Sequence, residues 1–170
     1  MIMPRSFDMA AEYEGTVEQV FRAFSDEQYW LARLAGSGAD KTTLDAMERT
    51  ADGGLDIVTT QTLRADRLPG VVSQFHHGDL SFVREETWGP VVDGQASAVV
   101  KGSITGAPAT LDGSVVLTAA DSGARLQFRA TVEVRIPLVG GKVENFIGSQ
   151  LVDLLIAEQR FTTEWILEHP

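Results

Sequence analysis

Apolar residues recur at helical spacing over the last stretch of the chain, from Val139 to His169. At 100° per residue, one face collects Val143, Ile147, Leu151, Leu154, Phe161 and Trp165. This pattern predicts an amphipathic helix of roughly 27 residues, about 40 Å long. Such a helix needs a broad apolar surface to lie on. One carboxylate, Glu158, interrupts the apolar face near its centre.

Alternating apolar and polar residues, the pattern of half-buried strands, fill most of the chain before this helix. The first predicted strand runs through Phe7, Met9, Ala11 and Tyr13. Further strands are predicted at Thr42–Arg49, Leu55–Arg64, Leu80–Trp88, Gln95–Thr105, Thr110–Ala120 and Arg125–Ile136. Because short turns join these strands, we expect an antiparallel sheet.

Two short helices are predicted directly after the first strand. Thr16-Val-Glu-Gln19 forms a capping box, and Ser25-Asp-Glu-Gln28 repeats that pattern. The second helix stops at Gly36 and carries Tyr29, Trp30, Leu31 and Leu34. Farther along, Leu68–His77 has the spacing of one short helix, or forms an irregular lid.

Composition narrows the classes of partner. The 170 residues are 44% hydrophobic and carry a formal net charge of −10, so we expect no nucleic-acid partner and no stable membrane association. The absence of cysteine excludes disulfides and zinc–thiolate sites. The sequence contains neither the apolar core of a signal peptide nor a transmembrane stretch. We therefore expect a single cytoplasmic domain over residues 1–170.

A resemblance to a known superfamily is carried by Ser6-Phe-Asp-Met9 with Val20-Phe-Arg-Ala-Phe24, Arg84-Glu-Glu-Thr-Trp-Gly89, Arg135-Ile-Pro-Leu-Val-Gly-Gly141, Gln150-Leu-Val-Asp-Leu-Leu155 and Glu158-Gln-Arg-Phe161. With this order of elements, the chain resembles the START / Bet v1-like (polyketide cyclase-like, SRPBCC) superfamily, in an uncharacterised actinobacterial branch. The resemblance implies an α+β helix-grip fold, a curved antiparallel sheet of about seven strands around the long C-terminal helix. Members of this superfamily enclose apolar small molecules, some as aromatases or cyclases and others as carriers.

Small side chains on two predicted strands face the long helix. One inward face would present Ala96, Ala98, Val100, Gly102 and Ile104, and the next Leu111, Gly113, Val115, Leu117 and Ala119. Small residues opposite a helix either let it pack closely or leave a void. Because interiors seldom keep voids, an enclosed space would indicate a ligand.

Glu158 is the strongest candidate for a catalytic or ligand-binding side chain, although no catalytic residue is assigned. A carboxylate facing an apolar interior loses solvation, so its pKa rises and it can act as a general acid or base. It can equally accept a hydrogen bond from a ligand. The alternatives are a carboxylate that is paired with an arginine of the cavity, or one that is solvated near the mouth.

Arg84 and Glu86 are possible partners on the Leu80–Trp88 strand. If Leu80, Phe82 and Trp88 face inward, then Arg84 and Glu86 also do; the other register buries Val83 instead. An inward Arg84 can pair with Glu158 or bind a ligand carboxylate through a bidentate contact.

Polar and aromatic side chains complete the predicted lining of a ligand-binding site. Gln61 and Gln150 are weaker polar candidates, and Gln150 lies at the edge of its helix face. The apolar candidates are Leu154 and the aromatic residues Trp30, Phe75, Trp88, Phe128, Phe161 and Trp165, which suit core packing as well as a flat or apolar ligand.

A metal site or an acid–base role is one interpretation of His76, His77 and Asp79. However, adjacent histidines point apart, and no third ligand has a recognisable spacing. An exposed loop is the favoured interpretation, in which Phe75 and His76 can still gate the cavity. The motifs of nucleotide-binding proteins, serine hydrolases and metalloproteases are absent. We expect no metal and no cofactor.

Val152 and Ile156 lie on the polar side of the long helix, either as scattered exposed residues or as the centre of a dimer contact. The oligomeric state is not determined by the sequence, and both a monomer and a homodimer are compatible with it.

Three functions remain. In the first, the chain binds a hydrophobic or amphipathic small molecule (lipid, sterol-like or polyketide-like) between sheet and helix. Alternatively, it is an aromatase, cyclase or dehydratase that uses Glu158, with His76 as a distant alternative. The third interpretation is a ligand-free interaction domain whose interior is filled by side chains. Fold analogy alone cannot choose among them.

Overall fold

The structure is a computed structural model of the chain and describes residues 5–73, 77–136 and 140–170. Its elements are, in chain order, β1 (Arg5–Tyr13), α1 (Val17–Phe24), α2 (Glu27–Ala35), β2 (Lys41–Arg49), β3 (Leu55–Leu63), the 3₁₀ turn η1 (Ala65–Arg67), α3 (Gly70–Ser73), β4 (Leu80–Trp88), β5 (Ala96–Ile104), β6 (Ala109–Ala120), β7 (Gly123–Val134) and α4 (Gly140–Glu168).

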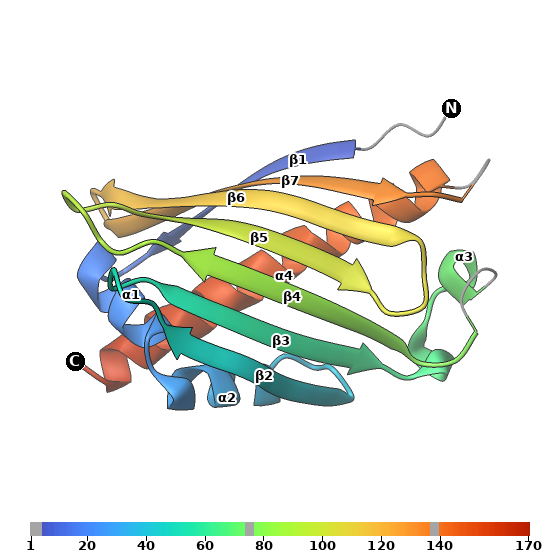
Figure 1. The fold of residues 1–170 in the computed structure, drawn as a ribbon, viewed down its shortest axis with the longest axis horizontal. Coiled ribbons are helices and arrows are strands. Elements are labelled where there is room, and N and C mark those ends of the chain that lie inside the picture. The colour runs from blue at the N-terminus through green and yellow to red at the C-terminus, as the bar shows by residue number, and fades with distance from the viewer. Residues whose placement is uncertain (1–4, 74–76, 137–139) are drawn as a thin grey trace.

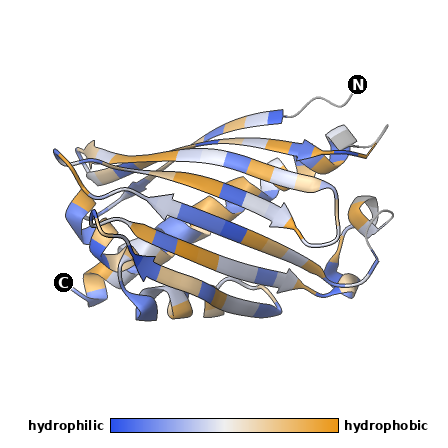
Figure 2. Ribbon diagram, in the orientation of Figure 1, coloured by the Kyte–Doolittle hydropathy of each residue, from blue (hydrophilic) through white to orange (hydrophobic). Residues whose placement is uncertain are grey.

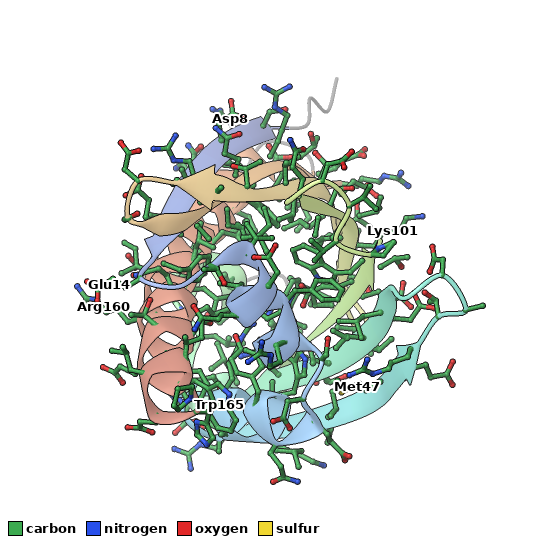
Figure 3. All side chains as sticks on the ribbon, turned by 90° about the vertical axis from the view of Figure 1, so that its left-hand side faces the viewer. Asp8, Glu14, Met47, Lys101, Arg160 and Trp165 are labelled. Carbon is green, nitrogen blue, oxygen red and sulfur yellow. The ribbon has the colours of Figure 1, made fainter. Side chains whose placement is uncertain are left out.

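Seven strands form one antiparallel sheet in the order β1-β7-β6-β5-β4-β3-β2. The first strand pairs with the last, so that Arg5 lies opposite Val132 and Tyr13 opposite Ala124. Two tight turns of the sheet use Gly53 and Gly94, whose φ angles of 90° and 74° lie in the region that favours glycine. The sheet curves around α4, as the view along the molecule shows (Figure 3). The predicted α+β helix-grip fold is confirmed.

Strand alternation separates an inner from an outer face, visible as alternating colours along the strands (Figure 2). On β7, Leu126, Ala130 and Val132 are buried. The outer face is charged, and the labelled side chains of Asp8 and Lys101 point away from the enclosed space (Figure 3). This alternation follows from the period of two of a strand that is buried on one side only.

The two short helices begin at side-chain caps. Thr16 accepts a hydrogen bond from the Gln19 N–H, and the Gln19 side chain accepts one from the Thr16 N–H, as the predicted capping box requires. The second helix is capped by Asp26, whose carboxylate accepts the Gln28 N–H. The prediction that Ser25 caps it was wrong, because Ser25 ends α1 and donates to the Phe21 carbonyl.

The long helix α4 crosses one face of the sheet diagonally, with α1 and α2 near its C-terminal end (Figure 1). Its 29 residues make it about 44 Å long at 1.5 Å per residue. It packs mainly on β1 and β7, at one side of the curved sheet. No helix in the described parts of the chain combines the length and the apolar character that crossing a membrane requires.

At the two glycines of the inner face, the space is filled by phenyl rings and not by α4. A Cβ added at Gly102 would lie 2.7 Å from the Phe82 ring, and one at Gly113 would lie 3.0 Å from the Phe128 ring. These phenyl rings, from strands next to the glycines, occupy the space that the missing side chains vacate. The sequence pattern suggested only helix approach or a void, and ring packing is the third solution.

Helix α3 occupies four residues within the predicted Leu68–His77 segment. The rest of that segment includes Phe75 and His76, which lie outside the described residues.

Candidate functional site

Glu158 lies on the inner side of α4, between arginines from two other elements. Arg33 of α2 places Nη2 2.5 Å from Glu158 Oε1, and Arg84 of β4 places Nη2 2.9 Å from Oε2. Arg84 Nη1 donates a longer bond of 3.4 Å to Oε1. The predicted Arg84–Glu158 pair is confirmed, and it ties α2, β4 and α4 together at one point.

Arg33 is a buried cation that is absent from the set of site residues predicted from the sequence. Its guanidinium carbon lies 4.5 Å from the centre of the Trp30 ring, and Nη1 donates to the Tyr29 hydroxyl at 3.2 Å. The Tyr29 hydroxyl lies 2.6 Å from the Thr162 hydroxyl, which itself donates to the Glu158 carbonyl. Because Thr162 uses its proton on that carbonyl, Tyr29 donates to Thr162. The chain of bonds fixes α2 against α4.

A signal for Arg33 was present in the sequence. Arg33 stands four residues after Tyr29 and three after Trp30, so it shares their face of the helix. Leu31, one of the apolar residues expected to mark this helix, is instead 43% exposed.

Arg84 and Glu86 both point into the interior from β4. Their side chains are only 12% and 11% exposed, so the alternative register that turns them outward is wrong. Arg84 Nε lies 3.4 Å from Glu86 Oε2. Within the described part of the chain, neither atom has a hydrogen-bond partner. The indole of Trp88 donates a long bond of 3.4 Å to the other oxygen of Glu86.

The ionisation of Glu158 is opposite to the expectation from its burial. Burial alone raises the pKa of this carboxyl, but the charges and hydrogen bonds of Arg33 and Arg84 outweigh it and bring the pKa to about 2. The predicted rise in pKa was wrong for that reason. At neutral pH Glu158 is an ionised ion-pair partner, which matches the interpretation of a carboxylate paired with an arginine.

A small pocket lies over these four charged side chains. Its volume is about 50 Å³, and its apolar walls come from both the sheet and α4. The apolar lining consists of Met9, Tyr13, Phe24, Trp88, Val100, Val115, Leu126, Phe128, Leu151, Leu154 and Leu155. Arg33, Arg84, Glu86 and Glu158 form its polar wall. The pocket therefore has one charged side in an otherwise apolar enclosure.

The structure brings only some of the predicted lining residues to this pocket. Those at its wall are Arg84, Trp88, Phe128, Leu154 and Glu158. Those away from it are Trp30, Gln61, Phe161 and Trp165, and Phe75 lies outside the described residues. Gln150 is exposed.

Of the four predicted residues away from the pocket, the three aromatic ones pack elsewhere in the interior. Trp30 is fully buried and donates to the Phe24 carbonyl at 2.7 Å. Phe161 and Trp165 pack on Tyr29, with ring centres 5.6 Å and 5.7 Å apart. Gln61 lies opposite Phe82 in the β3–β4 pair.

The predicted histidine segment gives no metal site in the part of the structure that can be described. His77 is exposed, and Asp79 accepts the Ala65 N–H at 3.0 Å. No group of three or more metal-ligating side chains occurs among the described residues. On the outer side of α4, Val152 and Ile156 are 41% and 44% exposed, as predicted.

The fold is shared with solved structures of low sequence identity. The di-domain ARO/CYC StfQ from the steffimycin biosynthetic pathway is similar with a TM-score of 0.62 and 14% identity, covering 98% of this chain and 52% of that one. A START superfamily protein from Mycobacterium smegmatis is similar with a TM-score of 0.55 and 15% identity, over 94% and 98% of the two chains. Ara h 8.0201 has a TM-score of 0.57 at 10% identity, over 95% and 99%. The START/Bet v1-like resemblance is thus confirmed at the level of the fold.

Relatives in sequence are much closer. An uncharacterized protein of Mycobacterium tuberculosis is 51% identical over 170 residues, which cover 96% of this chain and 98% of that protein. An uncharacterized protein of Mycobacterium bovis matches to the same extent. Residues 8–166 match the family described as "Protein of unknown function (DUF2505)". The chain, with its helix-grip fold and its charged cluster under α4, belongs to the DUF2505 family.

Proposed function

We propose that this protein binds a hydrophobic or amphipathic small molecule, of lipid, sterol-like or polyketide-like character, between the concave face of the sheet and α4. The observation that carries the proposal is the pocket, which has apolar walls from β1, α1, β4–β7 and α4 and a single polar side formed by Arg33, Arg84, Glu86 and Glu158. Small-molecule sites combine these features, since apolar walls supply affinity and a few polar groups fix orientation.

The volume of the pocket sets a condition on binding. At about 50 Å³ it has room for a few water molecules, whereas sites for drug-sized ligands measure about 300–1,000 Å³. Binding must therefore move side chains on the α4 side. Leu151, Leu154 and Leu155 form that side and are only half-buried. Because these three side chains belong to the helix and not to a strand, they can move without breaking a strand pair.

The alternative of an enzyme that uses Glu158 as acid or base receives no support from the geometry. Its carboxylate is engaged by Arg33 and Arg84, and a pKa of about 2 makes it a weak base at neutral pH. The similarity to an aromatase/cyclase protein concerns the fold alone.

Titration with Nile red, a neutral dye that fluoresces in apolar surroundings, tests the proposal. We expect saturable binding with one dye per chain. In Leu154→Trp the larger ring fills the pocket, so binding should fall at least tenfold. Val152→Trp is the matched control, because it adds the same ring on the exposed side of the same helix and should bind as the wild type does.

Two results would overturn the proposal: no saturable binding by the wild type, or equal binding by the Leu154→Trp variant. Circular dichroism establishes that each variant is folded. If Leu154→Trp does not fold, Leu151→Phe provides a smaller obstruction of the same wall. Native mass spectrometry of the purified protein, followed by solvent extraction, then identifies any compound bound.

A further inference from the structure

We infer that the polar end of the ligand is a neutral group that both donates and accepts a hydrogen bond, such as a hydroxyl, seated between Arg84 Nε and Glu86 Oε2. This inference rests on the proposed function, because it names the ligand chemistry of the same pocket. It predicts that alcohols and phenols bind and that carboxylic acids are rejected.

The first argument is the hydrogen-bonding state of the two atoms. Arg84 Nε carries a proton and Glu86 Oε2 carries lone pairs. They form an ion pair at 3.4 Å, but neither has a hydrogen-bond partner among the described residues. Buried polar atoms are nearly always paired in proteins, and leaving them unpaired is costly. A hydroxyl accepts from the Nε–H and donates to Oε2 at the same time, which satisfies both atoms.

The second argument is charge. The formal charges of Arg33, Arg84, Glu86 and Glu158 cancel, so the polar wall of the pocket has no surplus cation. Both terminal nitrogens of Arg84 already bond to Glu158. A ligand carboxylate would therefore face Glu86 and Glu158 as like charges without a free bidentate partner. The expected contact between Arg84 and a ligand carboxylate is disfavoured for this reason.

The third argument is what surrounds the polar pair. Phe24, Trp88 and Phe128 lie in the pocket wall with Val100 and Val115. Aromatic and branched side chains favour a flat apolar body next to the hydroxyl. A phenol or a ring-bearing alcohol therefore fits the site better than a polar metabolite does.

Three probes with one ring system separate the possibilities: 1-naphthol, 1-methylnaphthalene and 1-naphthoate. Two-dimensional ¹H–¹⁵N spectra of the full chain report binding through the indole N–H of Trp88, which bonds to Glu86. The Trp88 signal is assigned among the three tryptophans with a Trp88→Phe variant. We expect 1-naphthol to bind at least about tenfold more tightly than 1-methylnaphthalene, as hydrogen bonds to charged groups allow, and 1-naphthoate to bind most weakly.

Variants of two adjacent glutamates sharpen the comparison. Glu86→Leu removes the acceptor and leaves one uncompensated positive charge, so the preference for 1-naphthol should disappear and 1-naphthoate should bind more tightly. Glu85→Leu is the matched control, since it removes the same charge from the exposed face of the same strand and should leave the ranking unchanged. If Glu86→Leu does not fold, the ranking of the three probes by the wild type decides alone.

The outcomes distinguish the two levels of the proposal. If 1-methylnaphthalene or 1-naphthoate binds at the Trp88 site as tightly as 1-naphthol, the pocket binds ligands but the inferred polar group is wrong. If none of the probes moves the Trp88 signal and Nile red does not bind, the proposed function fails and the inference fails with it. If Nile red binds but 1-naphthol does not, only the inference is overturned.

Discussion

Arg33 and Glu158, which come from α2 and the distant C-terminal helix, meet at 2.5 Å in the buried space beside the pocket. Arg84 approaches the same carboxylate from β4. Three elements that are distant in sequence thus share one ionic centre. Desolvation offsets much of the attraction within a buried ion pair, so removing one partner, which leaves a buried charge unpaired, costs more than removing both.

The first prediction concerns acid stability. The pKa of Glu158 is about 2 in the folded chain against an ordinary value of 4.5. A lowered pKa contributes stability above pH 4.5, and this contribution is lost as the pH falls from 4.5 towards 2. The shift corresponds to about 3 kcal/mol at neutral pH. The difference in unfolding free energy between wild type and Glu158→Gln should therefore be constant above pH 5 and shrink below pH 4.5.

Urea unfolding at a series of pH values measures this difference. The exposed Glu85→Gln serves as the control and should show a small difference with little pH dependence. A wild-type advantage that grows as the pH falls would contradict the lowered pKa of Glu158.

The second prediction concerns coupling between Arg33 and Glu158. Arg33→Met and Glu158→Leu each leave an uncompensated buried charge, and each should cost about 3–5 kcal/mol. The double variant leaves Arg84 and Glu86 as a balanced pair. Its loss of unfolding free energy should therefore be far smaller than the sum of the losses in the two single variants. A double-mutant cycle measured by urea unfolding would show this. Additive losses would mean that the two side chains act independently.

Much of the fold could be predicted because local patterns determine it. The alternation of β7 and the apolar stripe of α4 follow from residue spacing alone. The inward register of Arg84 and Glu86 followed from the aromatic residues on either side of them on β4. Spacing also identified Glu158 as the residue out of place on the apolar face.

The electrostatics of the site could not be predicted in the same way. The sign of the pKa shift of Glu158 depends on where two arginines lie, and Arg33 is brought there only by tertiary packing of α2 against α4. The shape of the pocket wall depends on how Phe128 packs against Gly113. Spacing along the chain shows which faces are buried but not which rings fill them.

The third prediction concerns Glu144, a buried carboxylate near the start of α4 that no sequence pattern singled out. Its Oε2 accepts the Val134 N–H at 2.9 Å, and Oε1 lies 3.8 Å from Arg5 Nε. Glu144→Ala leaves the amide of Val134 unpaired at the end of β7, which should cost about 1–3 kcal/mol. Amide hydrogen exchange at Val134 should accelerate accordingly.

Glu144→Gln retains an acceptor oxygen, so it should preserve most of the protection at Val134. Asn145→Ala, on the exposed side of the same turn, should have almost no effect. Unchanged exchange at Val134 in the alanine variant of Glu144 would show that the side chain does not hold the end of β7.

The last prediction concerns the contact between α4 and β1. A Cβ added at Gly148 would lie 2.1 Å from the ring of Phe7, so the helix can approach the strand only because this residue is glycine. Gly148→Ala gains about 1 kcal/mol of helix propensity, but the clash must displace either the ring or the helix. Overpacking of this kind costs about 1–3 kcal/mol, and we expect a net loss of stability in thermal or urea unfolding.

The variant Phe7→Leu tests whether the clash causes the loss of stability, because its smaller side chain makes room for the added methyl group. The double variant Phe7→Leu/Gly148→Ala should be at least as stable as Phe7→Leu alone, since the helix propensity gain is then no longer offset by the clash. Ser149→Ala, at the exposed neighbouring position, is the control for propensity and should be neutral or slightly stabilising. If Gly148→Ala were as stable as Ser149→Ala in the wild-type background, the close packing of α4 on β1 would not depend on glycine at this position.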